Sequence, residues 1–154
     1  MKPTGSLKHF ILAFVIALML YATFYSGIEH RRTRNGPWQV TFTNDAGVPT
    51  LIVNEPKLHI ANLRINFPGE PAAPTNSTMI FDQPQPVPFA VPFGQCAFMD
   101  TTFQPGTIVF DMFGHEIQLL PRVLTIDKKE HPWRSDTTIS LKHEGGSSVP
   151  AKAQ

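Results

Sequence analysis

The chain has 154 residues, a formal net charge of +1 and a single cysteine, which excludes an intrachain disulfide and any two-cysteine redox site. Residues 1–34 hold five Lys or Arg against one Glu, a net charge of +4, whereas residues 35–154 hold eight basic and eleven acidic residues, a net charge of −3. The larger part of the chain therefore lacks the basic excess of a nucleic-acid-binding domain, and no nucleic-acid partner is expected.

The most informative segment is a run of 19 uncharged, mostly apolar residues at positions 10–28. As a helix it would be about 28 Å long, close to the ~30 Å hydrocarbon thickness of a bilayer. Its Leu, Ile, Phe and Val residues would contribute about 3–6 kcal/mol toward insertion. We therefore predict a transmembrane anchor helix over 10–28, preceded by a short tail, 1–9. The side chains expected to contact lipid or its boundary are those of Phe10, Leu12, Phe14, Ile16, Leu18, Leu20, Tyr21 and Tyr25.

Basic residues flank this run, with Lys8 before it and Arg31, Arg32 and Arg34 after it. We expect these four side chains to meet lipid headgroups, because a Lys or Arg near an anionic membrane surface gains about 1 kcal/mol. The lipid bilayer is thus the first predicted partner.

A removable secretory signal is the alternative interpretation of this segment, because a basic start before an apolar run is typical of both. The run exceeds the usual apolar core of about 7–15 residues. Its end also lacks a small-x-small pattern, since Phe24 lies two residues before Ser26 and Tyr25 two residues before Gly27. We therefore expect an uncleaved anchor.

The side of the membrane is the second question. Positive groups are equally numerous before and after the run, so the positive-inside rule does not choose an orientation. A short tail before the helix and a long domain after it favour a signal-anchor with the domain on the non-cytoplasmic side, periplasmic or extracellular. A dominant arginine cluster would place the domain in the cytoplasm instead.

After a charged linker, 29–37, residues 38–142 show the pattern of one all-β domain. Apolar and polar residues alternate over 38–43, a turn follows at 44–47, and a second strand is predicted at 49–53. Alternation resumes over 58–67 with a slip at Ala61-Asn62. A β-bulge at the slip would keep the apolar side chains on one face.

The rest of this domain is punctuated by proline and glycine. Residues 68–92 predict an extended covering loop with a brief edge strand at 78–81. A polar turn is expected at 127–130 and a disordered tail at 143–154. Many short strands with Gly/Pro turns predict a β-sandwich or a partly open barrel. The remaining strands are expected at 96–103, 108–113 (central, apolar on both faces), 115–120, 123–126 and 137–141.

His115-Glu116 is the first candidate for metal or acid–base chemistry. A zincin helix needs a second histidine three residues after the glutamate, where this chain has Leu119. Strand alternation also sends His115 and Glu116 to opposite faces. We therefore assign no catalytic residue, metal or cofactor. His59, His115 and His131 with Asp111 or Glu116 could form a looser metal cluster, because ligands can come from different strands. Separate histidines in turns and at strand edges are the preferred interpretation.

Three other features have both a functional and a structural interpretation. Trp133 and Arg134 form a candidate contact with a partner or a sugar ring, and the alternative is a core Trp with a solvent-facing Arg. Residues 83–89 favour polyproline II, a shape that aromatic grooves bind, although a loop over a sheet edge is preferred. Cys96 is expected to be a buried, inert thiol rather than a nucleophile.

Together these patterns predict a single-pass, membrane-anchored β-domain that acts as an interaction or accessory subunit of a membrane or cell-envelope assembly. Its expected partners besides lipid are other membrane or envelope proteins. One alternative is a membrane-anchored hydrolase that uses Asp111, Glu116 and a histidine. Another is a carbohydrate- or peptide-binding module built on Trp133 and Arg134.

Overall fold

The computed structural model describes residues 4–142 and divides the chain into two compact units, 1–34 and 35–154. The first unit consists of one helix, α1 (Thr4–Arg32). This helix begins before and ends after the predicted span 10–28, so parts of the expected tail and linker are helical. His30, Arg31 and Arg32 form its last turn, where positive charge is favourable to the helix dipole. The tail expected at 143–154 lies outside the described residues.

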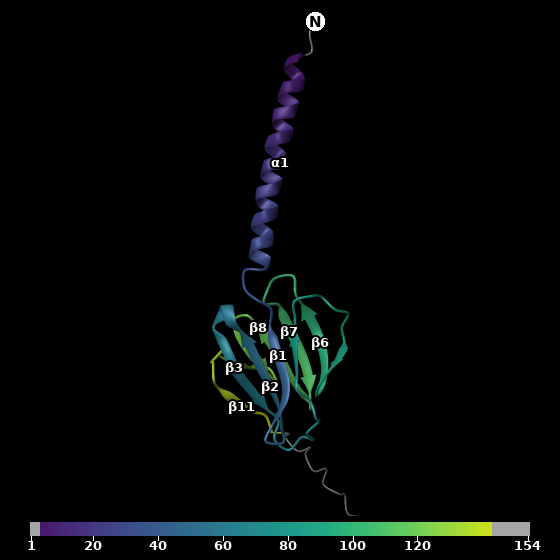
Figure 1. Cartoon of the computed structure of the whole chain (residues 1–154), viewed down its shortest axis with the longest axis vertical. Helices are drawn as coiled ribbons and strands as arrows, with labels where there is room; N and C mark the ends of the chain where they lie inside the picture. The colour runs from purple at the N-terminus through teal and green to yellow at the C-terminus, as the bar shows by residue number, and fades with distance from the viewer. Residues whose placement is uncertain (1–3, 143–154) are drawn as a thin grey trace, which may run out of the picture. The chain divides into compact units, whose positions relative to one another are not determined.

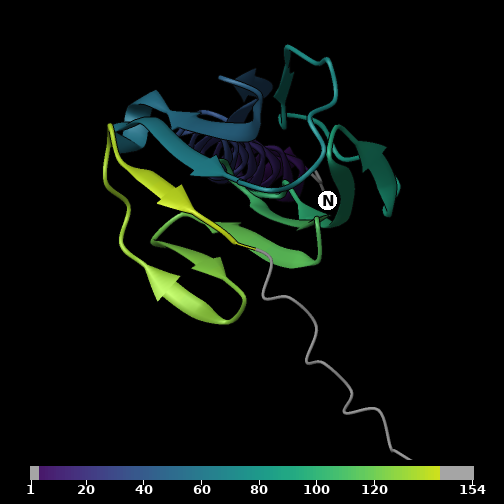
Figure 2. The same ribbon diagram turned by 90° about the horizontal axis from the view of Figure 1, so that it is seen from below.

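The second unit is built from two β-sheets that share one hydrophobic core, which confirms the predicted all-β domain after a single helix (Figures 1 and 2). The first sheet has the order β11-β3-β2-β1-β4 and the second the order β10-β9-β8-β7-β6-β5. Neighbouring strands are antiparallel except for β11, which pairs with β3 in parallel. In the first sheet the strands are β1 (Gln39–Asp45), β2 (Val48–Glu55), β3 (Ile60–Asn66), β4 (Ser77–Ile80) and β11 (Thr138–Ser140). In the second they are β5 (Phe89–Val91), β6 (Gly94–Asp100), β7 (Thr107–Met112), β8 (His115–Leu120), β9 (Val123–Ile126) and β10 (Lys129–His131).

Alternation along the strands produces the core between the sheets. Val40 and Phe42 of β1 are fully buried, and so are Ile108 and Phe110 of β7, while the residues between them are less buried. Phe42 and Phe110 meet edge to face with ring centroids 6.2 Å apart. The core therefore joins the first and second sheets through side chains that the period-2 pattern had identified.

Three hairpins are closed by two-residue turns whose central residues both have positive φ: Ala46-Gly47, Phe113-Gly114 and Asp127-Lys128. This is the backbone of a type I′ turn, whose twist matches that of the flanking strands. The polar turn expected at 127–130 is thus shorter than predicted. Lys129 already belongs to β10, because the tight turn leaves the chain in register with Ile126.

The predicted bulge at Ala61-Asn62 is confirmed. Between the pairs Val53–Leu63 and Glu55–Ile60, β3 holds one more residue than β2. Asn62 has a φ of 51°, and its backbone N–H donates to Asn54 Oδ1 at 2.7 Å. Ile60 and Leu63 therefore both reach the core although they are an odd number of residues apart.

Trp38, which precedes β1, is fully buried and connects distant parts of the domain. Its indole N–H donates to Gly106 O at 2.7 Å, and its ring lies 5.0 Å from that of Trp133. A Cβ on Gly106 would lie 1.9 Å from Asp100 O, so the close approach of residue 106 to Asp100 requires glycine.

Glu55 holds the segment through which the chain enters the domain. Its carboxylate is fully buried and accepts hydrogen bonds from the backbone N–H groups of Gly36, at 2.9 Å, and Leu58. The second bond caps the short helix η1 (Pro56–Leu58). Because both bonds satisfy a buried carboxylate, Gly36 is fixed against the sandwich.

The proline-rich segment 68–92 is largely irregular, as predicted, and β4 corresponds to the expected edge strand. β5 was not expected and forms a hairpin with β6. Cys96 of β6 is buried, and this burial raises the pKa of its thiol to about 11 despite a hydrogen bond to Phe98 O. Cys96 is thus buried, as predicted, and its raised pKa disfavours the reactive thiolate form.

Candidate functional site

Two features of the described chain have functional potential, and the first is α1. Its apolar side chains are distributed around the whole helix rather than along one stripe. All eight predicted lipid-contacting residues are exposed, and Tyr21 stacks on Tyr25 with ring centroids 6.1 Å apart. A helix that is apolar on every side suits a hydrocarbon environment better than a membrane–water interface. α1 is thus long and apolar enough to span a membrane.

The expected headgroup residues lie around the ends of this helix. Lys8 is in its second turn, Arg31 and Arg32 end it, and Arg34 follows two residues later. Arg32 also pairs with Glu29 at 3.3 Å, with both side chains about half exposed. An exposed pair of this kind contributes little to stability.

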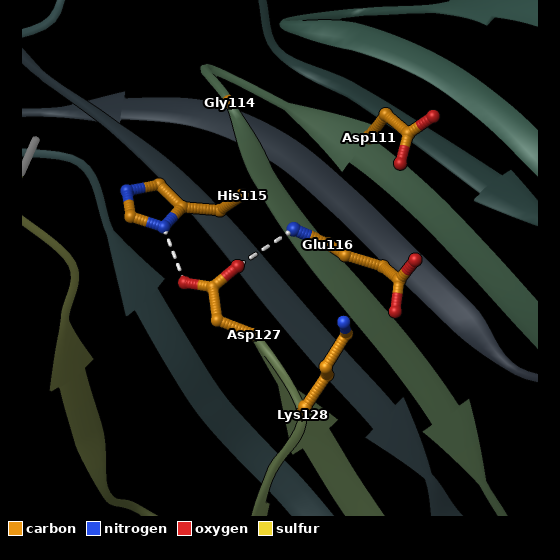
Figure 3. A pocket seen from close by; sticks show the side chains of 6 residues that line it. All are labelled: Asp111, Gly114, His115, Glu116, Asp127 and Lys128. Carbon is orange, nitrogen blue, oxygen red and sulfur yellow. Dashed lines mark hydrogen bonds and ion pairs between the residues drawn. The ribbon is translucent and has the colours of Figure 1, made fainter.

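The second feature is an open pocket of about 490 Å³ on the β-domain (Figure 3). It lies where β7 ends, β8 begins and the β9–β10 turn folds over them. It combines both signs of charge with a glycine. The lining residues are Asp111, Gly114, His115, Glu116, Asp127 and Lys128.

Asp127 organises one wall of this pocket. Its Oδ2 lies 2.6 Å from His115 Nδ1, and its Oδ1 accepts a hydrogen bond from the Glu116 backbone N–H at 3.0 Å. The Asp127 backbone N–H donates in return to Glu116 O at 2.9 Å. The turn residue therefore ties the start of β8 to the end of β9 and orients the imidazole of His115.

The same contacts shift the titration of Asp127. Partial burial acts to raise its pKa, but hydrogen bonds from His115 and the Glu116 N–H, with the charges of His115 and Lys129, outweigh burial and lower the pKa. Asp127 is thus a carboxylate at neutral pH. As an acceptor it favours the His115 tautomer that carries its proton on Nδ1.

Two further carboxylates face each other on the opposite wall. Asp111 of β7 and Glu116 of β8 are directly paired across the antiparallel strands. Side chains in this relation have Cβ atoms about 4.5–5.5 Å apart, so two like charges are unfavourable there. Each carboxylate has a glutamine donor: Gln95 Nε2 is 3.2 Å from Asp111 and Gln118 Nε2 is 2.6 Å from Glu116. Lys128 extends along the same side as Glu116 (Figure 3).

Two neighbouring pockets extend this one along the end of the sandwich. One, of about 410 Å³, shares Asp111 and Gly114 and continues to Phe89 of β5. The other, of about 600 Å³, shares His115 and Asp127 and continues to Ser140 of β11. The three together form a groove that crosses the β7–β8 turn, and a ligand longer than one small molecule would fit it.

His115 and Glu116 point to opposite faces of β8, as strand alternation predicts, because His115 pairs with the buried Met112 and Glu116 pairs with Asp111. His115 is, however, the first residue of β8 and stands at the end of the sandwich. Both therefore line one pocket. Among residues 4–142, no group of three or more His, Cys, Asp or Glu side chains is arranged to hold a metal ion. His59 and His131 lie on other elements, η1's C-cap and β10.

Trp133 and Arg134 are placed differently from an exposed aromatic platform. Trp133 is half-buried against the core beside Trp38, and its indole N–H donates to Leu120 O at 2.9 Å. Arg134 is exposed and lines a small pocket with Leu63 and Ile139. This packing matches the structural interpretation of Trp133 and leaves Arg134 as the accessible member of the pair.

Sequence reasoning identified Asp111, His115 and Glu116 but missed Asp127 and Lys128 as members of the same pocket. Their position depends on the type I′ turn, in which both residues have positive φ. An Asp-Lys pair directly after the short apolar segment 123–126 was the available signal, because Asp is among the residues that tolerate this conformation.

Comparison of the chain with models of protein families, with curated proteins and with solved structures gives no match in any of the three.

We predict that Asp127→Asn destabilises the domain in a pH-dependent way. Because folding lowers the Asp127 pKa, its contribution is present above the ordinary carboxylate pKa of ~3.9 and is lost as pH falls through the lower folded value. With the side chain 43% exposed, solvent screening limits the loss to about 1 kcal/mol near pH 6. Thermal unfolding of the full chain in detergent, followed by tryptophan fluorescence from pH 3 to 7, measures it. Glu130→Gln, in exposed β10, is the control, and an equal destabilisation at pH 3 and pH 6 would contradict the assignment.

Proposed function

We propose that the protein is a single-pass membrane protein whose β-sandwich acts as an interaction or accessory subunit of a membrane or cell-envelope assembly. The observation that carries the proposal is α1. Its apolar residues surround the helix, and none of its membrane-spanning window is buried by the rest of the chain. Exposure of so much apolar surface to water is unfavourable, by about 25 cal/mol per Å², whereas a bilayer would cover it.

The β-domain supports the proposal by its independence from α1. Its core is formed within residues 35–142, from Trp38 to Ile126, with no contribution from the helix. A membrane helix followed by a self-sufficient domain is the arrangement of a tethered module. We propose the non-cytoplasmic side for this domain, and protease accessibility in sealed vesicles tests it.

We predict that the full chain stays in the membrane after extraction with alkaline carbonate. The double variant Ile16→Asp/Leu20→Asp should be released, because two aspartates near the helix centre cost about 5–7 kcal/mol on the insertion scale. This cost offsets or exceeds the insertion free energy of about 3–6 kcal/mol that the apolar residues of α1 contribute. Ile16→Leu/Leu20→Ile is the matched control and should stay in the pellet.

The same membranes report the side on which the domain lies. In sealed right-side-out vesicles, added protease should digest the β-domain without detergent. Complete protection of the domain would place it in the cytoplasm. Recovery of the unsubstituted chain in the soluble carbonate fraction, or of a mature chain beginning beyond Gly27, would contradict the anchor itself.

The role as a subunit makes a separate prediction. After crosslinking in native membranes and mild detergent extraction, the chain should migrate as a complex with at least one other polypeptide in a fixed ratio. The Ile16→Asp/Leu20→Asp variant should lose this complex, since it no longer shares the membrane with its partner. A chain that remains monomeric after crosslinking would oppose an accessory role.

An anchored hydrolase is the second candidate, and the shared pocket of Asp111, Glu116 and His115 favours it. Two carboxylates at cross-strand positions beside a histidine oriented by Asp127 provide groups able to donate and accept protons. The charged lining residues and the open groove would suit a glycan or another chain-like substrate.

The hydrolase hypothesis predicts turnover of at least one class in a panel of glycan, ester and peptide substrates by the detergent-solubilised chain. Glu116→Gln should then reduce the rate by about 100-fold or more, as loss of a general acid or base does. Glu130→Gln lies outside the pocket and should keep the full rate. Equal rates in both variants would remove the pocket from the reaction.

A further inference from the structure

The end of the sandwich nearest to Asn35, here called the proximal end, is defined by three segments that meet around Trp38. Loop 101–106 contacts it through Gly106. The β8–β9 turn, 121–122, is next to it through Leu120, which accepts the Trp133 indole N–H. Helix η1 adjoins it because Glu55 bonds both Leu58 and Gly36. The groove that contains His115 lies at the other end, where β7 finishes.

This proximal end presents apolar side chains to solvent. Phe103, in the middle of loop 101–106, is 56% exposed, and Ile80, paired with Gln39 at the start of β1, is 53% exposed. The loop itself is well supported. Its Thr102 N–H donates to Asp100 at 2.9 Å, and its Gln104 side chain donates to Asp82 O at 3.2 Å. Phe103 is therefore held outward by an ordered loop rather than left out of the core by chance.

The segments that form the proximal end also carry exposed charged residues of both signs. Lys57 of η1 and Arg122 of the β8–β9 turn are exposed and basic, while Asp82 and Asp100 are acidic. A surface with both apolar and charged side chains suits contact with the boundary of a bilayer, where acyl chains meet phosphate and amine groups. The other strongly exposed Phe of the domain, Phe98, is 48% exposed and belongs to β6 rather than to a loop tip.

The length of the connecting chain supplies the independent argument. α1 ends at Arg32, and Gly36 is already fixed to the sandwich by Glu55. Four Cα-to-Cα steps span at most about 14 Å. The polar layer on each side of a bilayer is roughly 5–7 Å thick. If residues 10–28 span the hydrocarbon, residues 29–32 add about 6 Å of helix, so Gly36 stays within about 20 Å of the hydrocarbon boundary.

We propose that the proximal end of the β-sandwich rests on the lipid surface, with Phe103 and Ile80 inserted among the headgroups and Lys57 and Arg122 facing lipid phosphates. This inference rests on the proposed anchoring by α1 and adds a defined orientation to it. The distal groove, with His115 and Asp127, is then directed away from the membrane, toward soluble ligands or partner domains.

The test uses the full chain reconstituted into vesicles of phosphatidylcholine and phosphatidylglycerol at 3:1, with nitroxide quenchers at the headgroup. A thiol-reactive fluorophore is attached at Phe103→Cys or, as the distal control, at Lys129→Cys. Cys96 is buried and its thiol is protonated at the labelling pH, so the unsubstituted chain supplies the blank. We expect at least threefold stronger quenching at position 103 than at position 129.

A second comparison separates insertion from simple proximity. With the fluorophore at Ile80→Cys, the change Phe103→Asp should halve the quenching or more, because a carboxylate is excluded from the lipid boundary. Phe98→Asp removes an equally exposed ring from β6 and should leave the quenching unchanged. Equal quenching at 103 and 129, or no effect of Phe103→Asp, in a chain that resists carbonate would overturn the inference while the anchor stands. Release of the chain by carbonate would overturn both.

Discussion

The buried indole of Trp38 is the contact on which the arrangement of the β-domain depends. A buried N–H without an acceptor costs about 1–3 kcal/mol, and Gly106 O supplies that acceptor at 2.7 Å. Position 106 itself requires glycine, because any Cβ there would collide with Asp100 O at the other end of the loop. Trp133 packs at a tilt against the same indole and donates to Leu120 O. One side chain thus aligns the loops of both sheets at the proximal end.

At the distal end, two tight turns determine how the loops are arranged. The type I′ turns at Phe113-Gly114 and Asp127-Lys128 bring two loops to one place, and the Asp127 carboxylate links them through His115 and the Glu116 backbone. Phe113 occupies a positive φ, a strained position for an aromatic residue, and packs against Phe67 and Phe93 at 5.1 and 5.7 Å. Packing and hydrogen bonding therefore offset the strain, and the pocket that contains His115 is formed as a consequence.

The sequence predicted what depends on local periodicity. Alternation located most strands, and its slip at Ala61-Asn62 located the bulge, because each side chain's face follows directly from the period of two. Strands β5 and β10 were missed because β5 lies in the proline-rich segment and β10 begins in the charged run that predicted a polar turn. The parallel pairing of β11 with β3 and the approach of Asp127 to His115 depend on partners far away in the chain or on turn geometry. Residue types and their positions therefore identified Asp111, His115 and Glu116 as candidates without revealing that they share a pocket.

The parallel strand β11 has a consequence for biosynthesis. The rest of the first sheet is encoded before residue 81, but β3 keeps one unpaired edge until residues 138–140 arrive, after the whole second sheet has been made. The Arg64 N–H then donates to Thr137 O, and Asn66 O accepts from the Leu141 N–H. A nascent chain would present that open edge of β3 until β11 has been made, so the domain becomes resistant to edge-to-edge association only once residues 138–140 have paired.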